Sequence, residues 1–137
     1  MSLSKPRRRP AVHMIDSEAE ALADMAVGVE KRLPEVSAML IEEISRATIH
    51  TQARMPRDVI TMSSQVDFID EGSGTLRTVQ LVYPQDADID AGRISILTPI
   101  GAGLIGLRPG QSIRWPDRDG RMRKLSVVAV VQPVKAA

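Results

Sequence analysis

The stretch from Val79 to Leu107 reads VQLVYPQDADIDAGRISILTPIGAGLIGL, and its pattern decides the fold. At its start, the apolar side chains of Val79, Leu81 and Tyr83 occupy every second position. This period of two is typical of a strand that turns one face toward a core. Because proline cannot donate a hydrogen bond to a neighbouring strand, Pro84 ends the strand. The stretch therefore predicts that a half-buried strand precedes a loop.

A second alternating segment, from Arg93 to Leu97, follows this polar loop. It ends at Thr98 and Pro99, a pair that favours the start of a helix, with threonine as the cap and proline in the first turn. Gly106 favours a left-handed stop. The sequence thus predicts a short helix packed on the sheet. Its apolar residues recur at helical spacing: Ile100, Leu104 and Leu107.

Two amphipathic helices are predicted upstream, from Asp16 to Leu33 and from Glu35 to Thr51, with Pro34 between them. A connection this short predicts an antiparallel hairpin. Each apolar stripe covers only about two heptads, so we expect the hairpin to lean on the domain that follows it. The two stripes are Leu22, Met25, Val29 and Leu33, and Val36, Leu40, Ile44 and Ala47.

The remaining segments complete a sheet. Strands are predicted at residues 64–70, 76–83, 112–115 and 122–131, and in the last of these Leu125, Val127, Ala129 and Val131 are expected to share a face. The fold class is therefore α+β, with a helical hairpin followed by an antiparallel sheet and one short helix. We expect three segments: a disordered basic tail (1–14), the hairpin (15–53) and the sheet domain (54–137). The tail is either a solvated segment or an arm that touches nucleic acid.

Composition limits the function. The chain has 137 residues, a net charge of +1 and no cysteine. This small charge does not predict non-specific nucleic-acid binding, so we expect at most indirect contact with nucleic acid. The absence of cysteine excludes disulfides and thiolate chemistry. No apolar run approaches the roughly 20 residues of a membrane span. We expect a cytoplasmic monomer that does not contact a membrane.

Three groups of residues resemble metal or cofactor sites, but each lacks a feature that such a site needs. Asp86, Asp88 and Asp90 resemble the start of a calcium loop, but the glycine and glutamate that such a loop needs later are missing. His13 and His50 are expected to be isolated, because no cysteine accompanies them. The glycines at 101, 103 and 106 are expected to serve packing rather than dinucleotide binding, which needs a parallel βαβ unit. We predict no metal, no cofactor and no catalytic residue.

The run LVYPQDADIDAGRISILTPIGAGLIGLRPGQSIRW, residues 81–115, resembles the C-terminal domain of the GreA/GreB transcription elongation factors, and most closely the Rnk branch, the regulators of nucleoside diphosphate kinase. The resemblance extends to MPRDVITMSSQVDF at residues 55–68 and to VVQP at 130–133. It implies an FKBP-like sheet domain that docks at the rim of the secondary channel of bacterial RNA polymerase. The residues expected to make contact are Pro99, Ile100, Gly101, Leu104 and Trp115 on the domain, and Glu30, Lys31, Arg32 and Glu35 at the hairpin tip.

In the Gre factors, a long coiled coil carries an adjacent Asp-Glu pair at its tip, which helps to hold a catalytic metal for transcript cleavage. The corresponding tip here reads VEKRLPE, residues 29–35, and has no such pair. A helix of about 17 residues would also span only about 25 Å. The resemblance therefore implies a non-catalytic regulator that competes with Gre factors. Two alternatives stay open: a Gre-like cleavage factor, and a stand-alone FKBP-like binding module or isomerase, which the single Phe, Tyr and Trp disfavour.

Overall fold

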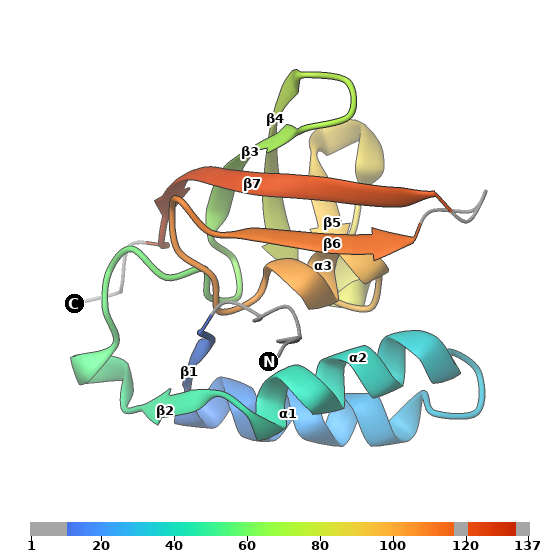
Figure 1. Cartoon of the computed structure of the whole chain (residues 1–137). Helices are drawn as coiled ribbons and strands as arrows, with labels where there is room; N and C mark the ends of the chain where they lie inside the picture. The colour runs from blue at the N-terminus through green and yellow to red at the C-terminus, as the bar shows by residue number, and fades with distance from the viewer. Residues whose placement is uncertain (1–10, 117–120, 134–137) are drawn as a thin grey trace, which may run out of the picture.

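The computed structural model describes residues 11–116 and 121–133, except for the side chains of residues 115 and 116. A helical pair lies beneath a five-stranded sheet (Figure 1). The elements in chain order are β1 (His13–Ile15), α1 (Asp16–Gly28), α2 (Pro34–Ser45), β2 (Thr48–His50), the short 3-10 helix η1 (Gln52–Arg54), β3 (Gln65–Asp70), β4 (Thr75–Val82), η2 (Pro84–Asp86), η3 (Ile89–Ala91), β5 (Arg93–Ser95), α3 (Pro99–Leu104), β6 (Ser112–Pro116) and β7 (Met122–Val131).

The large sheet has the strand order β5-β4-β3-β7-β6. β3 pairs antiparallel with β4 and β7, and β7 pairs antiparallel with β6. β5, however, runs parallel to β4, so the prediction of a wholly antiparallel sheet is wrong at this edge. The alternation of apolar residues indicates which face of a strand is buried, but it carries no information about strand direction. The α+β class predicted from the sequence holds, with a mixed sheet.

The last strand also differs from its predicted pattern. Leu125 and Val127 are buried as expected, but Val131 is 61% exposed. The pairing of β3 with β7 shifts register between Asp67 and Phe68, where Phe68 faces Val127 and Asp67 faces Ala129. A β-bulge of this kind inserts one residue and turns the following side chains to the other face. Consequently Val130, rather than Ala129 or Val131, packs against the core.

The two helices lie side by side, and the chain reverses between them at residues 29–33 (Figure 1). Both helices are shorter than predicted. α1 ends at Gly28, since glycine is a weak helix former, and α2 begins at Pro34, whose fixed φ suits the first turn. α2 ends at Ser45, and Thr48–His50 forms β2 in place of the last predicted turn, as β-branched Thr48 and Ile49 favour.

A two-stranded parallel sheet that the sequence did not predict closes the base of this hairpin. β1 pairs with β2, with His13 facing Thr48 and Ile15 facing His50. Val12 and Met14 are 1% and 2% exposed, so the last residues of the expected tail, 1–14, belong to the core instead. Residues 1–10 of that tail lie outside the described residues. A period-two pattern cannot be recognised in so short a strand.

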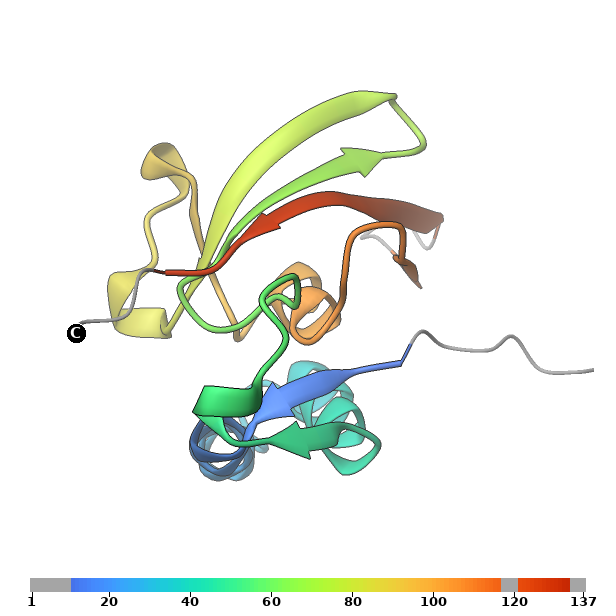
Figure 2. The same ribbon diagram turned by 90° about the vertical axis from the view of Figure 1, so that its left-hand side faces the viewer.

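One hydrophobic core joins the helices to the sheet domain. α3 lies between the sheet and the hairpin, so the molecule has three layers when it is viewed along the helices (Figure 2). There is thus no break in packing at the expected boundary between residues 53 and 54. The shared core cluster includes Leu22 and Ala26 of α1, Val36 and Leu40 of α2, Ala102 and Leu104 of α3, and Val66, Phe68, Leu81, Leu125 and Val127 of the sheet.

Ser37 fastens the two helices to each other near the tip. Its side chain is 1% exposed, and its Oγ donates a hydrogen bond to the Ala26 carbonyl at 2.8 Å. We expect Ser37→Ala to lower the free energy of unfolding by about 1 kcal/mol, because the Ala26 carbonyl would lose a buried partner. Urea unfolding would measure the change.

The matched control is Ser45→Ala on the same helix. The Ser45 Oγ also donates to a backbone carbonyl, that of Glu42 at 2.9 Å, but this bond is exposed and lies within α2. Water can replace an exposed hydrogen bond, so we expect a change of less than about 0.5 kcal/mol. Equal effects of the two substitutions would contradict a role for the Ser37 bond in joining the helices.

Candidate interaction surface

The turn between α1 and α2 presents a charged surface, which we call the tip: Glu30, Lys31, Arg32 and Glu35. All four side chains are exposed. The turn itself is held in place, because Val29 is only 8% exposed and its carbonyl accepts the Leu33 N–H at 2.7 Å. The structure therefore displays the predicted tip residues together at one end of the molecule, three on the fixed turn and Glu35 in the first turn of α2 (Figure 1).

The predicted contact residues around α3 are only partly accessible. Pro99 is exposed and Ile100 is half-buried, but Gly101 is buried and Leu104 is 0% exposed. Direct contact between Leu104 or Gly101 and a partner is therefore excluded in this conformation. Their apolar spacing reflects core packing, because α2 lies against the side of α3. Trp115 is in β6, but its side chain lies outside the described residues.

The local structure of α3 follows from its sequence. Thr98 Oγ1 accepts the Gly101 N–H at 3.1 Å, which is the cap predicted from the Thr98-Pro99 pair. At Gly106 φ is +86°, the left-handed stop that was predicted, and a Cβ at this position would lie 3.0 Å from the His13 carbonyl. A Cβ at Gly101 would meet the Ser95 carbonyl and would lie 3.0 Å from Ile96 Cα. The glycines thus serve close packing.

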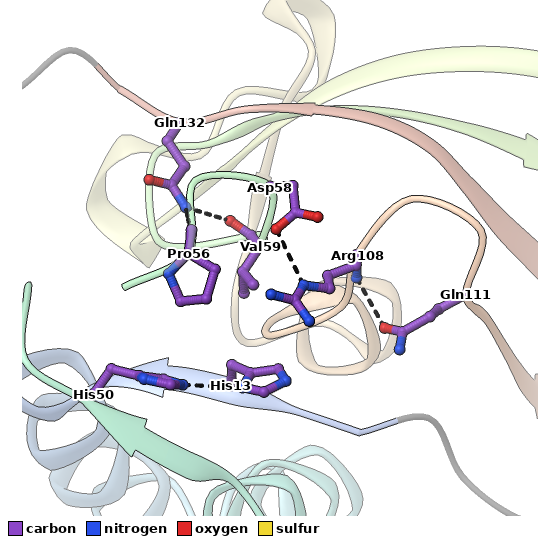
Figure 3. Close-up of polar contacts among 8 residues, drawn as sticks. All are labelled: His13, His50, Pro56, Asp58, Val59, Arg108, Gln111 and Gln132. Atoms are coloured by element: carbon purple, nitrogen blue, oxygen red, sulfur yellow. Dashed lines mark hydrogen bonds and ion pairs between the residues drawn. The ribbon is translucent and has the colours of Figure 1, made fainter. Parts of the chain in front are cut away.

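Two histidines that the sequence predicts to be isolated lie together in the structure, so this prediction is wrong. His13 Nδ1 lies 3.0 Å from His50 Nε2, although the two residues stand 37 positions apart (Figure 3). They project from neighbouring strands, β1 and β2. Burial, Arg108 and His50 together lower the pKa of His13, against a smaller opposite effect of Asp58. Only the pairing of β1 with β2, which is not visible in the sequence, could have located this pair.

Polar contacts next to the histidines hold the segment before β3 against the sheet domain (Figure 3). Arg108 Nε donates to Asp58 Oδ1 at 3.1 Å, and the Arg108 backbone N–H donates to Gln111 Oε1 at 2.9 Å. Gln132, at the end of the chain's described part, donates to the Pro56 and Val59 carbonyls at 2.7 and 2.8 Å. These polar side chains therefore stabilise the fold, and their clustering does not indicate a binding site.

A small pocket of about 150 Å³ lies between α1 and the end of β7. Within it, Glu18 accepts the Met62 N–H at 3.1 Å, and burial raises the pKa of the Glu18 carboxyl. This volume is well below the roughly 300 Å³ of a typical ligand site. None of the lining residues is aromatic; they are Ile15, Glu18, Gln52, Met55, Thr61, Gln132 and Pro133.

The acidic loop that resembles the start of a calcium site has a structural role. In residues 11–116 and 121–133, no three His, Cys, Asp or Glu side chains are close enough to hold a metal ion together. In the acidic loop, Asp88 Oδ1 accepts the Ala91 N–H at 3.3 Å, and the carboxylate also pairs with Arg93 at 3.6 Å. Asp88 therefore stabilises a turn. Among the described residues, no helix has the length and apolar character needed to cross a membrane.

Comparisons with known proteins agree with this architecture. The family model "Transcription elongation factor, GreA/GreB, C-term" matches residues 55–132. The regulator of nucleoside diphosphate kinase of Escherichia coli is 32% identical over 129 residues, which cover 94% of this chain and 95% of that protein. The transcription elongation factor GreA of Acidiphilium cryptum is 31% identical over 134 residues, covering 92% of this chain and 85% of that protein.

A solved structure extends the likeness to three dimensions. The prokaryotic transcription elongation factor GreA/GreB from Nitrosomonas europaea matches with a TM-score of 0.71 and 32% sequence identity. The match covers 90% of this chain and all of that chain, so it includes residues beyond the 55–132 segment. The predicted resemblance is thus confirmed by sequence and by structure. The chain belongs to the GreA/GreB family of transcription elongation factors.

Proposed function

We propose that this protein is a non-catalytic transcription regulator that binds bacterial RNA polymerase at the rim of the secondary channel. It acts as a cytoplasmic monomer and competes there with Gre factors. The sheet domain, which we take to be FKBP-like, docks at the rim, and the tip enters the mouth of the channel. Membership of the GreA/GreB family and the similarity to the regulator of nucleoside diphosphate kinase of Escherichia coli support this proposal.

The observation that carries the proposal is the arrangement of the hairpin. Its apolar side is packed against its own domain through Leu22 and Leu40, which are both 0% exposed. α1 has 13 residues and spans about 20 Å. Because the helices lie along the domain (Figure 1), the hairpin does not project from it as a long arm, and the tip at its end is exposed. A hairpin of this length fits the mouth of a channel and does not carry a group to a distant catalytic centre.

The composition of the tip favours a non-catalytic role. Mg²⁺ in a protein site takes one or two carboxylates and completes its coordination with water and phosphate. The tip instead places Lys31 and Arg32 between the acidic residues Glu30 and Glu35. A cation would be repelled by the two basic side chains. Cleavage of stalled transcripts is therefore expected not to be stimulated by this protein.

The two other candidate functions have less support. A Gre-like cleavage factor would need the missing Asp-Glu pair at the tip. An FKBP-like isomerase would need an apolar, aromatic-lined pocket to desolvate a prolyl amide, but the pocket beside Glu18 has no aromatic lining. A transcript-cleavage assay on stalled complexes and a prolyl-peptide turnover assay test these candidates directly.

Charge reversal at the tip tests the proposed contact. We expect the double substitution Lys31→Glu, Arg32→Glu to weaken binding to RNA polymerase by about tenfold or more, since truncating or reversing charged contacts at an interface costs about 2 kcal/mol or more. Both side chains are exposed, so thermal stability should not change. The measurement is the equilibrium affinity of each variant for purified polymerase core.

The matched control is Arg54→Glu, Arg57→Glu, which makes the same change in net charge on exposed side chains. Arg54 ends η1, at the other end of the hairpin from the tip (Figure 1). We expect this control to bind polymerase as the unmodified protein does, apart from a general electrostatic effect that salt removes. Equal weakening by both double substitutions would remove the tip from the proposed interface.

A further inference from the structure

The histidine pair links the two strands at the base of the hairpin by a contact that depends on protons. The ring centroids of His13 and His50 are 5.2 Å apart, and the facing nitrogens, Nδ1 and Nε2, are 3.0 Å apart. A hydrogen bond at this distance needs a proton on one nitrogen and a lone pair on the other. The neutral pair and the singly protonated pair both meet this condition. The doubly protonated pair does not, because two N–H groups then face each other.

The surroundings add to the cost of the second proton. Among the described residues, the charged groups that act on His13 are Arg108 and Asp58, together with His50 itself. Arg108 projects from the chain between α3 and β6, and Asp58 lies in the segment before β3. The Asp58 carboxylate is already paired with Arg108 Nε at 3.1 Å, so it offsets the charge of Arg108 more than that of a second imidazolium. Two imidazolium ions would therefore repel each other with little compensation.

The two strands are not held equally strongly. β1 is fixed on the sheet domain, because Val12 and Met14 are buried in the core and the His13 N–H donates to the Gly106 carbonyl at 3.2 Å. Within the described residues, β2 pairs with β1 alone. Its Ile49 side chain is 48% exposed, so little buried surface retains it. Repulsion across the pair would thus displace β2 rather than β1.

We propose that His13 and His50 form a one-proton latch: it holds β2 against β1 while the pair carries at most one proton, and it releases β2 when mild acid protonates both rings. This property goes beyond the proposed function and does not depend on polymerase binding. The lowered pKa of His13 shows in which direction the stability changes with pH. The folded state binds fewer protons than the unfolded state, so the contribution of the pair is complete above the unfolded value of 6.5 and is lost as the pH falls toward the lowered value.

A nuclear magnetic resonance titration of the full chain tests the shared proton. His13 and His50 are the only two histidines in the sequence, so their imidazole signals identify the pair without further labelling. We expect the two rings to titrate in two coupled steps, because the second proton must enter a pair that already shares one. Two independent titrations, both close to the ordinary value of about 6.5, would overturn the proposal.

Amide hydrogen exchange tests the release of β2. The reporter is the Thr48 amide, which donates to the Val12 carbonyl at 2.8 Å. After correction for intrinsic exchange, we expect its opening to increase at least about fivefold between about pH 7.5 and pH 5, from the repulsion of two unit charges about 4 Å apart even at the dielectric constant of water. The Ile60 amide, which donates to the Leu107 carbonyl at 2.8 Å, reports global unfolding, and we expect it to stay far better protected than the Thr48 amide at both pH values.

Two variants remove the titration while they keep polar atoms in place. In His50→Gln an amide takes the position of Nε2, and in His13→Asn an amide takes the position of Nδ1. We expect the opening of Thr48 to become independent of pH in both. The latch would be contradicted if Thr48 opening increased in acid as much in both variants as in the unmodified protein. It would also be contradicted if acid did not increase Thr48 opening in the unmodified protein. Unchanged exchange at Ile60 in each variant would show that its fold is intact.

Discussion

Replacing Leu40 with alanine is expected to lower the free energy of unfolding by about 3 kcal/mol, because it opens a cavity in a close-packed core. Leu40 lies on α2, is 0% exposed and belongs to the same core cluster as residues of α1, α3 and the sheet. Since one core serves both parts of the chain, we also expect the variant to unfold in a single transition. Urea unfolding followed by far-UV circular dichroism and by Trp115 fluorescence measures both quantities.

The matched control is Ile41→Ala on the same helix. Ile41 is 41% exposed, so its truncation removes a similar number of methyl groups without opening a buried cavity. We expect a cost of less than about 1 kcal/mol. Two separate transitions in the Leu40→Ala variant, with the sheet domain unfolding as in the unmodified protein, would contradict the shared core. The hairpin would then be an independent appendage of the sheet domain.

The second large effect is expected at the start of α3. Gly101→Ala should lower the free energy of unfolding by about 3 kcal/mol, because the new Cβ would press on the Ser95 carbonyl and on the Ile96 backbone. Both obstacles are backbone atoms, which cannot move aside as the end of a side chain can. Alanine has a higher helix propensity than glycine, which stabilises a helix by roughly 1 kcal/mol. We expect the steric loss to exceed this gain. Thermal and urea unfolding would measure the difference.

Gly103→Ala separates the steric effect from helix propensity. It lies on the same helix, but the atom nearest to its new Cβ is the end of the flexible Ile113 side chain. We expect a change of less than about 1 kcal/mol, since Ile113 can adopt another rotamer. If the two glycine substitutions had the same effect, the close approach of α3 to the end of β5 would not explain the glycine at position 101.

The segments that the sequence predicted correctly are those in which local chemistry suffices. Thr98 and Pro99 start α3 because the cap and the fixed φ of proline act within a few residues. Gly106 adopts the predicted positive φ for a similar local reason. The strand from Met122 to Val131 has the predicted bounds, because its apolar alternation is long.

Apart from the ends of the two helices, the errors concern contacts between distant parts of the chain. The parallel pairing of β5 with β4 and the bulge in β7 depend on how strands meet, which alternation does not encode. The pairing of β1 with β2 brought His13 to His50 although neither strand is longer than three residues. At the candidate surface, the charges of the tip residues were enough to predict that they are exposed. The burial of Leu104 could not be predicted, because it depends on where α2 packs against α3.

The most direct test of the proposed function is the binding of the purified full-length protein to bacterial RNA polymerase core, with and without a Gre factor as competitor. We predict saturable binding that the Gre factor displaces completely, since both would occupy the rim of the same channel. Simultaneous binding of both proteins would contradict the proposed site, and the absence of binding at micromolar concentrations would contradict the proposed function itself.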